Sequence, residues 1–258
     1  MSLSLRDKII ARMNELGIEP KRSLGQNFLV SEVVVSRIID AAKPGDFAKT
    51  FEIGPGLGAL TDHLNEQSQS LELIELDKSF VEYWRKKDFK VTEQDALKFP
   101  WQELFVEDKS NLLVSNLPYQ ISSRLVIDLS LLENSFDRMV LMFQKEVGQR
   151  LLAAEGTEDY GLLTVVAQCF WHIHLVTEAG AVDFMPKPNV ASRVLRFDRR
   201  EGIPGNIKAK DFLRFLKTSF ANRRKKLLPK LVSYHKKDQL IKIFEDLSIS
   251  PDIRGERL

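Results

Sequence analysis

The sequence predicts an α/β fold, in which helices cover both faces of a mostly parallel sheet, with a small all-helical domain at the C-terminal end. Apolar runs alternate with helical patterns from about residue 48, as in chains of βαβ units. Three glycines follow the first of these runs, and no strand-like run follows residues 201–206. We therefore expect two domains, residues 1–200 and 201–258.

The predicted elements follow in chain order. Residues 4–16 form a short amphipathic helix with Ser4 as N-cap and Gly17 as stop, and residues 32–42 form a second helix. A helix and a closing strand share residues 162–179, and the segment after residue 206 has helical periodicity. The remaining strands are the apolar runs at 48–53, 70–76, 89–94, 111–116, 138–143 and 192–200.

Composition excludes several classes of protein. The 43% apolar and 29% charged content is ordinary for a soluble globular protein. No apolar run is long enough for a membrane span, and the N-terminal segment lacks a secretory signal. We expect a cytoplasmic, monomeric protein without a membrane segment.

The chain contains a single cysteine, Cys169, so no intrachain disulfide can form. Its neighbours predict a buried strand thiol. His172 and His174 lie close by, but no fourth ligand follows at a suitable spacing for zinc. We expect no metal site.

Charge is distributed unevenly along the chain. Residues 201–258 carry 14 Lys plus Arg against 7 Asp plus Glu, whereas the first 200 residues carry 24 against 29. This asymmetry indicates a basic module with a polyanionic partner, although a well-solvated helical surface is the commoner explanation.

The stretch "FEIGPGLGAL" predicts a ligand-binding turn between a strand and a helix. Gly54, Gly56 and Gly58 allow the backbone to turn sharply and to approach a ligand closely. Because the ends of parallel strands share one edge, Glu75, Asp95 and Asn116 should converge with Gly54 in one crevice. An acid in the position of Glu75 can accept both hydroxyls of a ribose.

Simpler explanations exist for some of these side chains. Asp77 and Asp95 could both be helix N-caps, which we expect for Asp77 and not for Asp95.

No lysine follows the glycines, so the turn is not a P-loop. A Gly-x-Gly-x-Gly turn after the acidic Glu52 resembles the first motif of Rossmann-like S-adenosylmethionine-dependent methyltransferases. That resemblance places Glu52 beneath the amino-acid end of the cofactor.

The stretch "SNLPYQ" has the groups needed to hold an adenine N6 amine. The side-chain oxygen of Asn116 and a backbone carbonyl of Leu117 or Pro118 can accept from that amine, which favours a tetrahedral nitrogen. Pro118 stiffens the turn, and Tyr119 offers a face on which a flipped-out base can stack. A turn that merely closes a strand is the alternative, and the glycines and acidic strand ends make it the weaker one.

The order of several motifs resembles the rRNA adenine dimethyltransferase family, and within it the branch that acts on the small ribosomal subunit. The resemblance runs from about residue 21 to about residue 228. The motifs are "KRSLGQNFL", "EIGPGLGALT", "IELD", "QDAL", "SNLPYQIS", "FQKEVGQRL", "FMPKPNVASRV" and "SFANRRKKLLPKL".

This resemblance implies roles for individual residues. Gln26, Asn27 and Leu29 would close over S-adenosylmethionine, and Asn116 would touch both cofactor and target amine. Phe184 would stack on the target base opposite Tyr119, although a core ring is its simpler role. The remaining cofactor contacts would come from Gly54 and Gly56 at the methionine part, Glu75 and Leu76 at the ribose, and Asp95 and Ala96 at the adenine.

The resemblance also implies a substrate. Two adjacent adenosines near the 3′ end of 16S rRNA would each receive two methyl groups, on a late assembly intermediate of the small subunit. The family usually continues past the segment 250–258 with another helix, which would complete the RNA-binding surface. Alternatives are a macrolide-resistance methyltransferase of the large subunit, a DNA adenine methyltransferase and a non-catalytic assembly or transcription factor.

Basic residues of the second domain are candidates for RNA contact. Arg223, Arg224, Lys225 and Lys226 are predicted to lie on one helix, where phosphate contact is their natural use and helix-end solvation the alternative. Weaker candidates are Lys21, Arg22, Lys145 and Arg150.

Overall fold

The computed structural model describes residues 3–19, 27–104, 110–132, 135–202 and 208–257. The chain forms two compact units, Met1–Gly148 with Phe170–Arg200, and Gln149–Cys169 with Glu201–Leu258. The predicted division at residue 200 therefore differs from the observed units by the segment 149–169. This segment joins the C-terminal unit because Gly156 N donates to Glu256 O at 2.8 Å and Tyr160 packs against Phe220, with ring centroids 6.0 Å apart.

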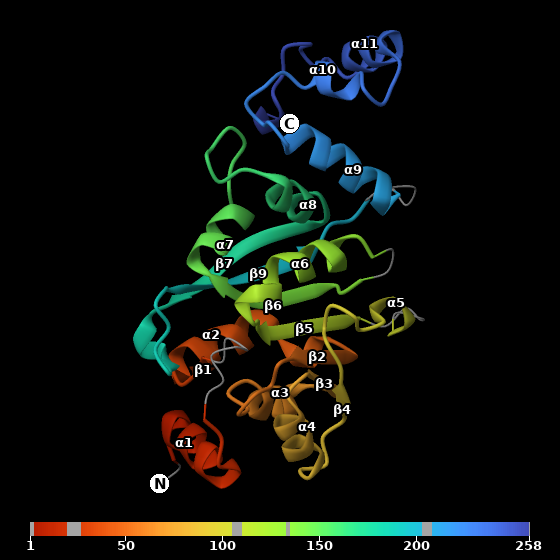
Figure 1. The fold of residues 1–258 in the computed structure, drawn as a ribbon. Coiled ribbons are helices and arrows are strands. Elements are labelled where there is room, and N and C mark those ends of the chain that lie inside the picture. Colours follow the sequence, from red (N-terminus) through yellow and green to blue (C-terminus); the bar gives the residue numbers. More distant parts are fainter. Residues whose placement is uncertain (1–2, 20–26, 105–109, 133–134, 203–207, 258) are drawn as a thin grey trace. The chain divides into compact units, whose positions relative to one another are not determined.

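A seven-stranded sheet forms the centre of the first unit, in the order β4-β3-β2-β5-β6-β9-β7 (Figure 1). The first five strands in this order are parallel, and β9 runs antiparallel to both β6 and β7. The strands are β2 (Lys49–Ile53), β3 (Leu71–Glu75), β4 (Val91–Glu93), β5 (Asn111–Asn116), β6 (Arg138–Gln144), β7 (Trp171–Ala179) and β9 (Ser192–Arg199). The predicted strands are confirmed.

A separate two-stranded sheet pairs β1 (Phe28–Leu29) with β8 (Phe184–Met185) in antiparallel register. It brings Leu29 opposite Phe184. Both residues are buried in the same apolar cluster as the central sheet.

Helices cover the central sheet on both faces. All residues of β5 from Asn111 to Ser115 are buried, and consecutive burial along a strand requires cover on each face. α2 contacts β6, β7 and β9, whereas α4 contacts β3 and β4. The helices of this unit are α1 (Leu5–Leu16), α2 (Glu32–Ala42), α3 (Thr61–Gln67), α4 (Lys78–Arg85), α5 (Trp101–Leu104) and α6 (Tyr119–Ser130), with short 3₁₀ turns at η2 (Pro44–Asp46) and η3 (Ala181–Asp183).

The N-terminal helix has the predicted ends. Ser4 Oγ accepts from Asp7 N at 3.2 Å, and Gly17 ends the helix in the left-handed conformation, with φ of 58°. One face of α1 is exposed and the other is buried, and Leu5 and Ile9 on the buried face point into the core.

The C-terminal unit has its own small core, in which Leu227, Leu231, Leu240 and Phe244 pack together. Its helices are α8 (Leu162–Phe170), α9 (Ala209–Phe220), α10 (Leu228–Leu231) and α11 (Lys237–Asp246), with a 3₁₀ turn at η4 (Gly255–Arg257); α7 (Lys145–Leu151) spans the boundary between the units. None of the helices in the described ranges has the length and apolar character that a bilayer crossing needs.

Two predictions in this unit are wrong. Cys169 lies near the end of α8 rather than in a strand, and its side chain is exposed rather than buried. Residues 223–226 lie between α9 and α10 in a turn and a β-bridge, not on one helix. The chain leaves the helix there because Lys226 pairs with Arg254 across that bridge.

Candidate active site

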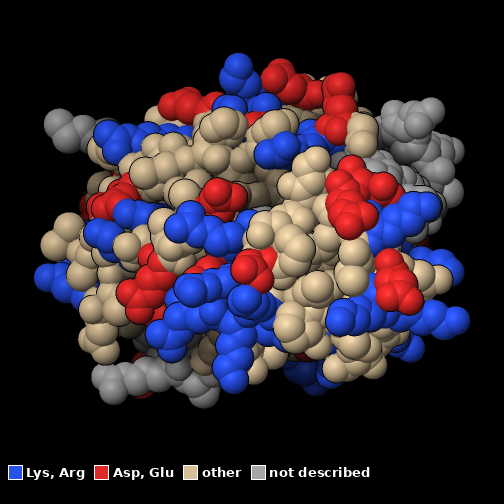
Figure 2. Space-filling model, turned by 90° about the horizontal axis from the view of Figure 1, so that it is seen from above, with Lys and Arg blue, Asp and Glu red and all other residues tan. Residues whose placement is uncertain are grey.

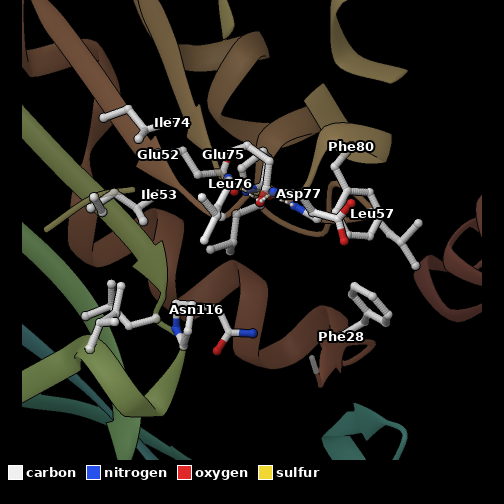
Figure 3. A pocket seen from close by; sticks show the side chains of 18 of the residues that line it. Phe28, Glu52, Ile53, Leu57, Ile74, Glu75, Leu76, Asp77, Phe80 and Asn116 are labelled. Carbon is white, nitrogen blue, oxygen red and sulfur yellow. Dashed lines mark hydrogen bonds between the residues drawn. The ribbon is translucent and has the colours of Figure 1, made fainter. Parts of the chain in front are cut away.

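A pocket opens at the carboxyl ends of β2, β3 and β5, in the first unit (Figure 3). The glycine turn after β2 forms part of its wall. Glu75 and Leu76 project into it from the end of β3, and Asn116 projects from the end of β5. The predicted site residues that line it are Asn27, Leu29, Gly54, Gly56, Glu75, Leu76, Asp95, Ala96, Asn116, Leu117, Pro118 and Tyr119.

The glycine turn needs glycine at more than one position. Gly54, Gly56 and Gly58 all have positive φ, of 66°, 49° and 84°. A Cβ on Gly58 would also come within 2.6 Å of the Trp84 ring. The indole of Trp84 donates from Nε1 to Gly56 O at 2.9 Å, which fixes one peptide plane of the turn.

Glu75 is a buried acceptor at the end of β3. Its Oε1 accepts from Leu76 N at 2.7 Å and from Asp77 N at 2.9 Å, whereas the contact that the described residues give Oε2 is a long one, 3.4 Å from Gly56 N. Burial raises the pKa of this carboxyl, and the three backbone N–H groups act in the opposite direction. Oε2 is thus the oxygen available to a ligand hydroxyl.

Glu52 is a second buried acid in the same pocket wall. Burial raises its pKa to about 8, with smaller contributions from the charges of Asp62 and Glu75, while the Thr61 hydroxyl lowers it. Its Oε2 has no hydrogen-bond partner within the described ranges. A buried oxygen of this kind is suited to a cationic group that a ligand would bring.

Asp77 and Asp95 have different surroundings. Asp77 is the N-cap of α4, and its Oδ1 accepts from Ser79 N at 3.1 Å, as predicted. Asp95 also bonds the backbone, because its Oδ1 accepts from Leu97 N at 2.9 Å, but no α-helix begins there. Its second oxygen has no partner among the described residues and stays available to an adenine amino group.

The amide of Asn116 has a defined orientation. Its Nδ2 donates to Asn27 O at 3.2 Å, and only the nitrogen of an amide can donate to a carbonyl. The side-chain oxygen therefore faces away from Asn27, and within the described part of the chain it accepts no hydrogen bond. The end of the strand is held by Ser115, whose Oγ donates to Ile53 O at 2.6 Å.

Pro118 and Tyr119 form the start of α6. Pro118 is the N-cap with φ of −57°, and Tyr119 is the first helical residue. The Tyr119 hydroxyl shares a hydrogen bond of 2.9 Å with Ser192 Oγ, and burial raises the pKa of Tyr119. The ring is therefore held in place and only half-buried.

Phe184 does not line this pocket. Its side chain is 2% exposed and packs in the core next to β1. A stacking role needs an exposed face, so the role predicted for Phe184 requires a different side-chain position. Gln26 and Arg22 lie outside the described residues, as does Lys21.

The predicted RNA-contacting residues differ in their surroundings. Lys145 lies 3.7 Å from Glu178 in an ion pair, and Arg150 is half-buried in the last turn of α7. Arg223 donates from Nη1 to Glu158 O and, at 2.8 Å, to Tyr160 O. The remaining candidates are Lys226, which pairs with Asp252 at 2.6 Å, and the exposed Arg224 and Lys225.

Of these candidates, Arg223, Arg224 and Lys225 line a polar hollow in the C-terminal unit, formed by 156–158 and 220–225 with Glu256. Figure 2 shows one face of the molecule, on which Lys and Arg side chains gather with Asp and Glu side chains among them. Within the described ranges, no group of three or more His, Cys, Asp or Glu side chains is arranged to hold a metal ion.

The fold is that of a Rossmann-like α/β protein, a class in which ligands bind at the carboxyl ends of the parallel strands, where this pocket lies. Comparisons with known proteins specify the family. A family model described as ribosomal RNA adenine dimethylase matches residues 18–254. The chain belongs to this family. The protein is an rRNA methyltransferase, and its methyl donor is S-adenosylmethionine.

Individual relatives agree with this assignment. The chain is 47% identical to the ribosomal RNA small subunit methyltransferase A of Bdellovibrio bacteriovorus, over 98% of this chain and 93% of that protein. A dimethyladenosine transferase from Plasmodium falciparum is similar in structure, with a TM-score of 0.76 and 25% identity over 90% of this chain and 92% of that chain. The 23S rRNA methyltransferase ErmE shares the fold, with a TM-score of 0.64 and 21% identity over 90% of this chain and 96% of that chain.

Proposed function

We propose that this protein dimethylates N6 of two adjacent adenosines near the 3′ end of 16S rRNA, in a late assembly intermediate of the small ribosomal subunit. The similarity to a small subunit methyltransferase at 47% identity supports this substrate. The reaction takes place in the cytoplasm, where ribosomes assemble, and the protein acts as a monomer without a metal.

The orientation of the Asn116 amide is the observation that carries the proposal. Because Nδ2 is bonded to Asn27 O, the side-chain oxygen of Asn116 is left as an acceptor beside the cofactor pocket. An exocyclic adenine amine carries two hydrogens and needs two acceptors. The backbone carbonyl of Leu117 or Pro118 supplies the second, and the fixed φ of Pro118 limits where these carbonyls can point.

These acceptors promote the reaction by binding its transition state more strongly than the planar amine. The nitrogen becomes tetrahedral and positively charged as it gains the methyl group, and acceptors on its hydrogens stabilise that charge. S-adenosylmethionine supplies a methyl group on a good leaving group, so no general base has to act before transfer. Tyr119 supports the target base by stacking, with its ring fixed through Ser192.

The other pocket residues fit S-adenosylmethionine. Glu75 Oε2 and the second oxygen of Asp95 are acceptors for the ribose and the adenine amine, and Ala96 lies against the base. Gly54 and Gly56 allow the methionine part to lie against the backbone. The unpartnered oxygen of Glu52 suits the ammonium group of the amino-acid end. Asn27 and Leu29 cover the cofactor, and we assign Gln26 the same role.

The basic residues of the C-terminal unit hold RNA phosphates. Arg224, Lys225 and Lys226 are exposed, and because Lys226 is paired with Asp252 we assign phosphate contact chiefly to Arg224 and Lys225. Arg22, Lys145 and Arg150 are further contacts. Phosphate contacts position RNA without specifying its sequence, so the folded intermediate itself selects the two adenosines.

Methyl transfer from labelled S-adenosylmethionine tests the proposal. Small subunits that lack the modification are the substrate, with large subunits and duplex DNA in parallel, and the labelled nucleosides are identified after digestion. We expect N6,N6-dimethyladenosine from small subunits alone. Label in large subunits would assign the protein to the resistance class, and cofactor binding without any label would identify a non-catalytic assembly factor.

A further inference from the structure

The N-terminal helix α1 contacts the glycine turn directly. Arg12 donates from Nη1 to Leu57 O at 2.7 Å and approaches Gly58 O at 3.5 Å. Its Nη2 pairs with Asp62 in α3 at 2.7 Å. One guanidinium therefore connects the backbone of the turn with the helix that follows it.

Trp84 completes this arrangement. Its Nε1 donates to Gly56 O, and the guanidinium of Arg12 lies over its ring, with Arg12 Cζ 5.6 Å from the ring centroid. The carbonyl oxygens of three successive residues, 56–58, thus face donors from α1 or α4. With these carbonyls held, the peptide planes of the turn cannot rotate independently.

The position of α1 is itself well determined. Ile9 is fully buried and lines the cofactor pocket, and Leu5 N donates to Glu32 Oε1 at 2.9 Å. The family model starts at residue 18, so α1 lies outside the part of the chain that the family description covers.

We infer that Arg12 is a positioning residue for S-adenosylmethionine, which acts by fixing the carbonyls of residues 57 and 58 so that the glycine turn keeps the shape that accepts the cofactor. This inference rests on the proposed binding of the cofactor along the turn. Three glycines with positive φ give the turn many alternative conformations, and an outside donor is an effective way to select one.

The charge of Arg12 contributes as well. Asp62 is one of the groups whose charge raises the pKa of Glu52, and Arg12 neutralises Asp62 at 2.7 Å. Loss of Arg12 would leave the Asp62 carboxylate unpaired close to the pocket. Both effects act on the cofactor site, whereas neither reaches Asn116 or the target adenine.

Arg12→Met tests the inference, because methionine keeps the apolar stem and removes every donor. We expect the Kd for S-adenosylmethionine, measured by calorimetry without RNA, to rise about tenfold, the effect of losing one charge-assisted hydrogen bond. The KM for the cofactor should rise in parallel, while kcat and the KM for small subunits stay within about twofold of the wild-type values. Arg12→Lys should recover part of the affinity.

Arg6→Met is the matched control, since Arg6 is exposed on the same helix and the substitution is identical. It should leave the Kd unchanged. Trp84→Phe provides a second test if Arg12→Met does not fold, because it removes the donor to Gly56 O and should also weaken cofactor binding.

Glu75→Ala separates the two ways in which the inference can fail. If Glu75→Ala weakens cofactor binding and Arg12→Met does not, the role of Arg12 is refuted and the cofactor site stands. If neither variant changes the Kd, the proposed cofactor site is itself wrong. A lowered Tm of Arg12→Met with an unchanged Kd would likewise refute the role, because it would show a purely structural contact.

Discussion

Replacing Glu52 by glutamine should change how the stability of the protein depends on pH. Burial raises the pKa of Glu52 from 4.5 to about 8. Below pH 4.5 this carboxyl is protonated in both the folded and the unfolded state. Between the two values the unfolded chain releases the proton and the folded chain keeps it, so the stability of the wild type falls as pH rises and reaches its lower limit above pH 8.

The size of the effect follows from this window. Each pH unit inside it lowers the stability of the wild type by about 1.4 kcal/mol through this one group, so about 2.7 kcal/mol is lost between pH 5.5 and 7.5. Glutamine has nearly the same shape and does not titrate. The free energy of unfolding of Glu52→Gln relative to the wild type should therefore increase by about that amount over the same interval.

Urea unfolding followed by tryptophan fluorescence measures this difference. All three tryptophans, Trp84, Trp101 and Trp171, belong to the first unit, so the signal reports the unit that contains Glu52. Titrating groups that do not interact with Glu52 contribute equally to both proteins and cancel. A difference between variant and wild type that stays constant from pH 5.5 to 7.5 would show that Glu52 is ionised in the folded protein.

Three further predictions concern the chemistry and the RNA. Asn116→Ala should abolish methyl transfer, because it removes the acceptor for the target amine, while the RNA affinity measured by filter binding should not change. Turnover like that of the wild type would contradict the catalytic assignment. Tyr119→Phe loses only the hydrogen bond to Ser192, so it should keep its activity and lose about 1 kcal/mol of stability. Tyr119→Ala also loses base stacking, which should lower kcat/KM by about tenfold or more. Equal activities of the two variants in a turnover assay would exclude stacking. Neutralising Arg224 and Lys225 to glutamine should weaken RNA binding and reduce the slope of log K against log salt by about 1.5, with the Tm unchanged; an unchanged slope would remove both from the interface.

Sequence was a good guide to the pocket because parallel strands impose a common edge. Each of these apolar runs ends at or near a polar residue. Because strands joined by βαβ connections are parallel, their carboxyl ends lie at one edge of the sheet, so Glu75, Asp95 and Asn116 could be placed together without knowledge of side-chain contacts. The N-cap role of Asp77 was equally local, since it depends on the two residues that follow.

Tertiary contacts account for the errors. Residues 223–226 have good helical propensity, but the guanidinium of Arg223 bonds backbone carbonyls of the segment 149–169, and this contact and the bridge at Lys226 override propensity. The observed units differ from the predicted boundary at residue 200 in the same segment, 149–169. Neither contact has a signal in the sequence, because the partners are more than 25 residues apart and no periodicity connects them.

The two buried acids of the pocket have a common physical meaning. Among the described residues, no Lys or Arg forms an ion pair with Glu52 or Glu75, and burial raises the pKa of both. A fold optimised for stability alone would pair such groups or replace them by apolar ones. Glu52, whose pKa is raised to about 8, is mostly protonated at neutral pH, and a positively charged group bound beside it would favour its ionised form.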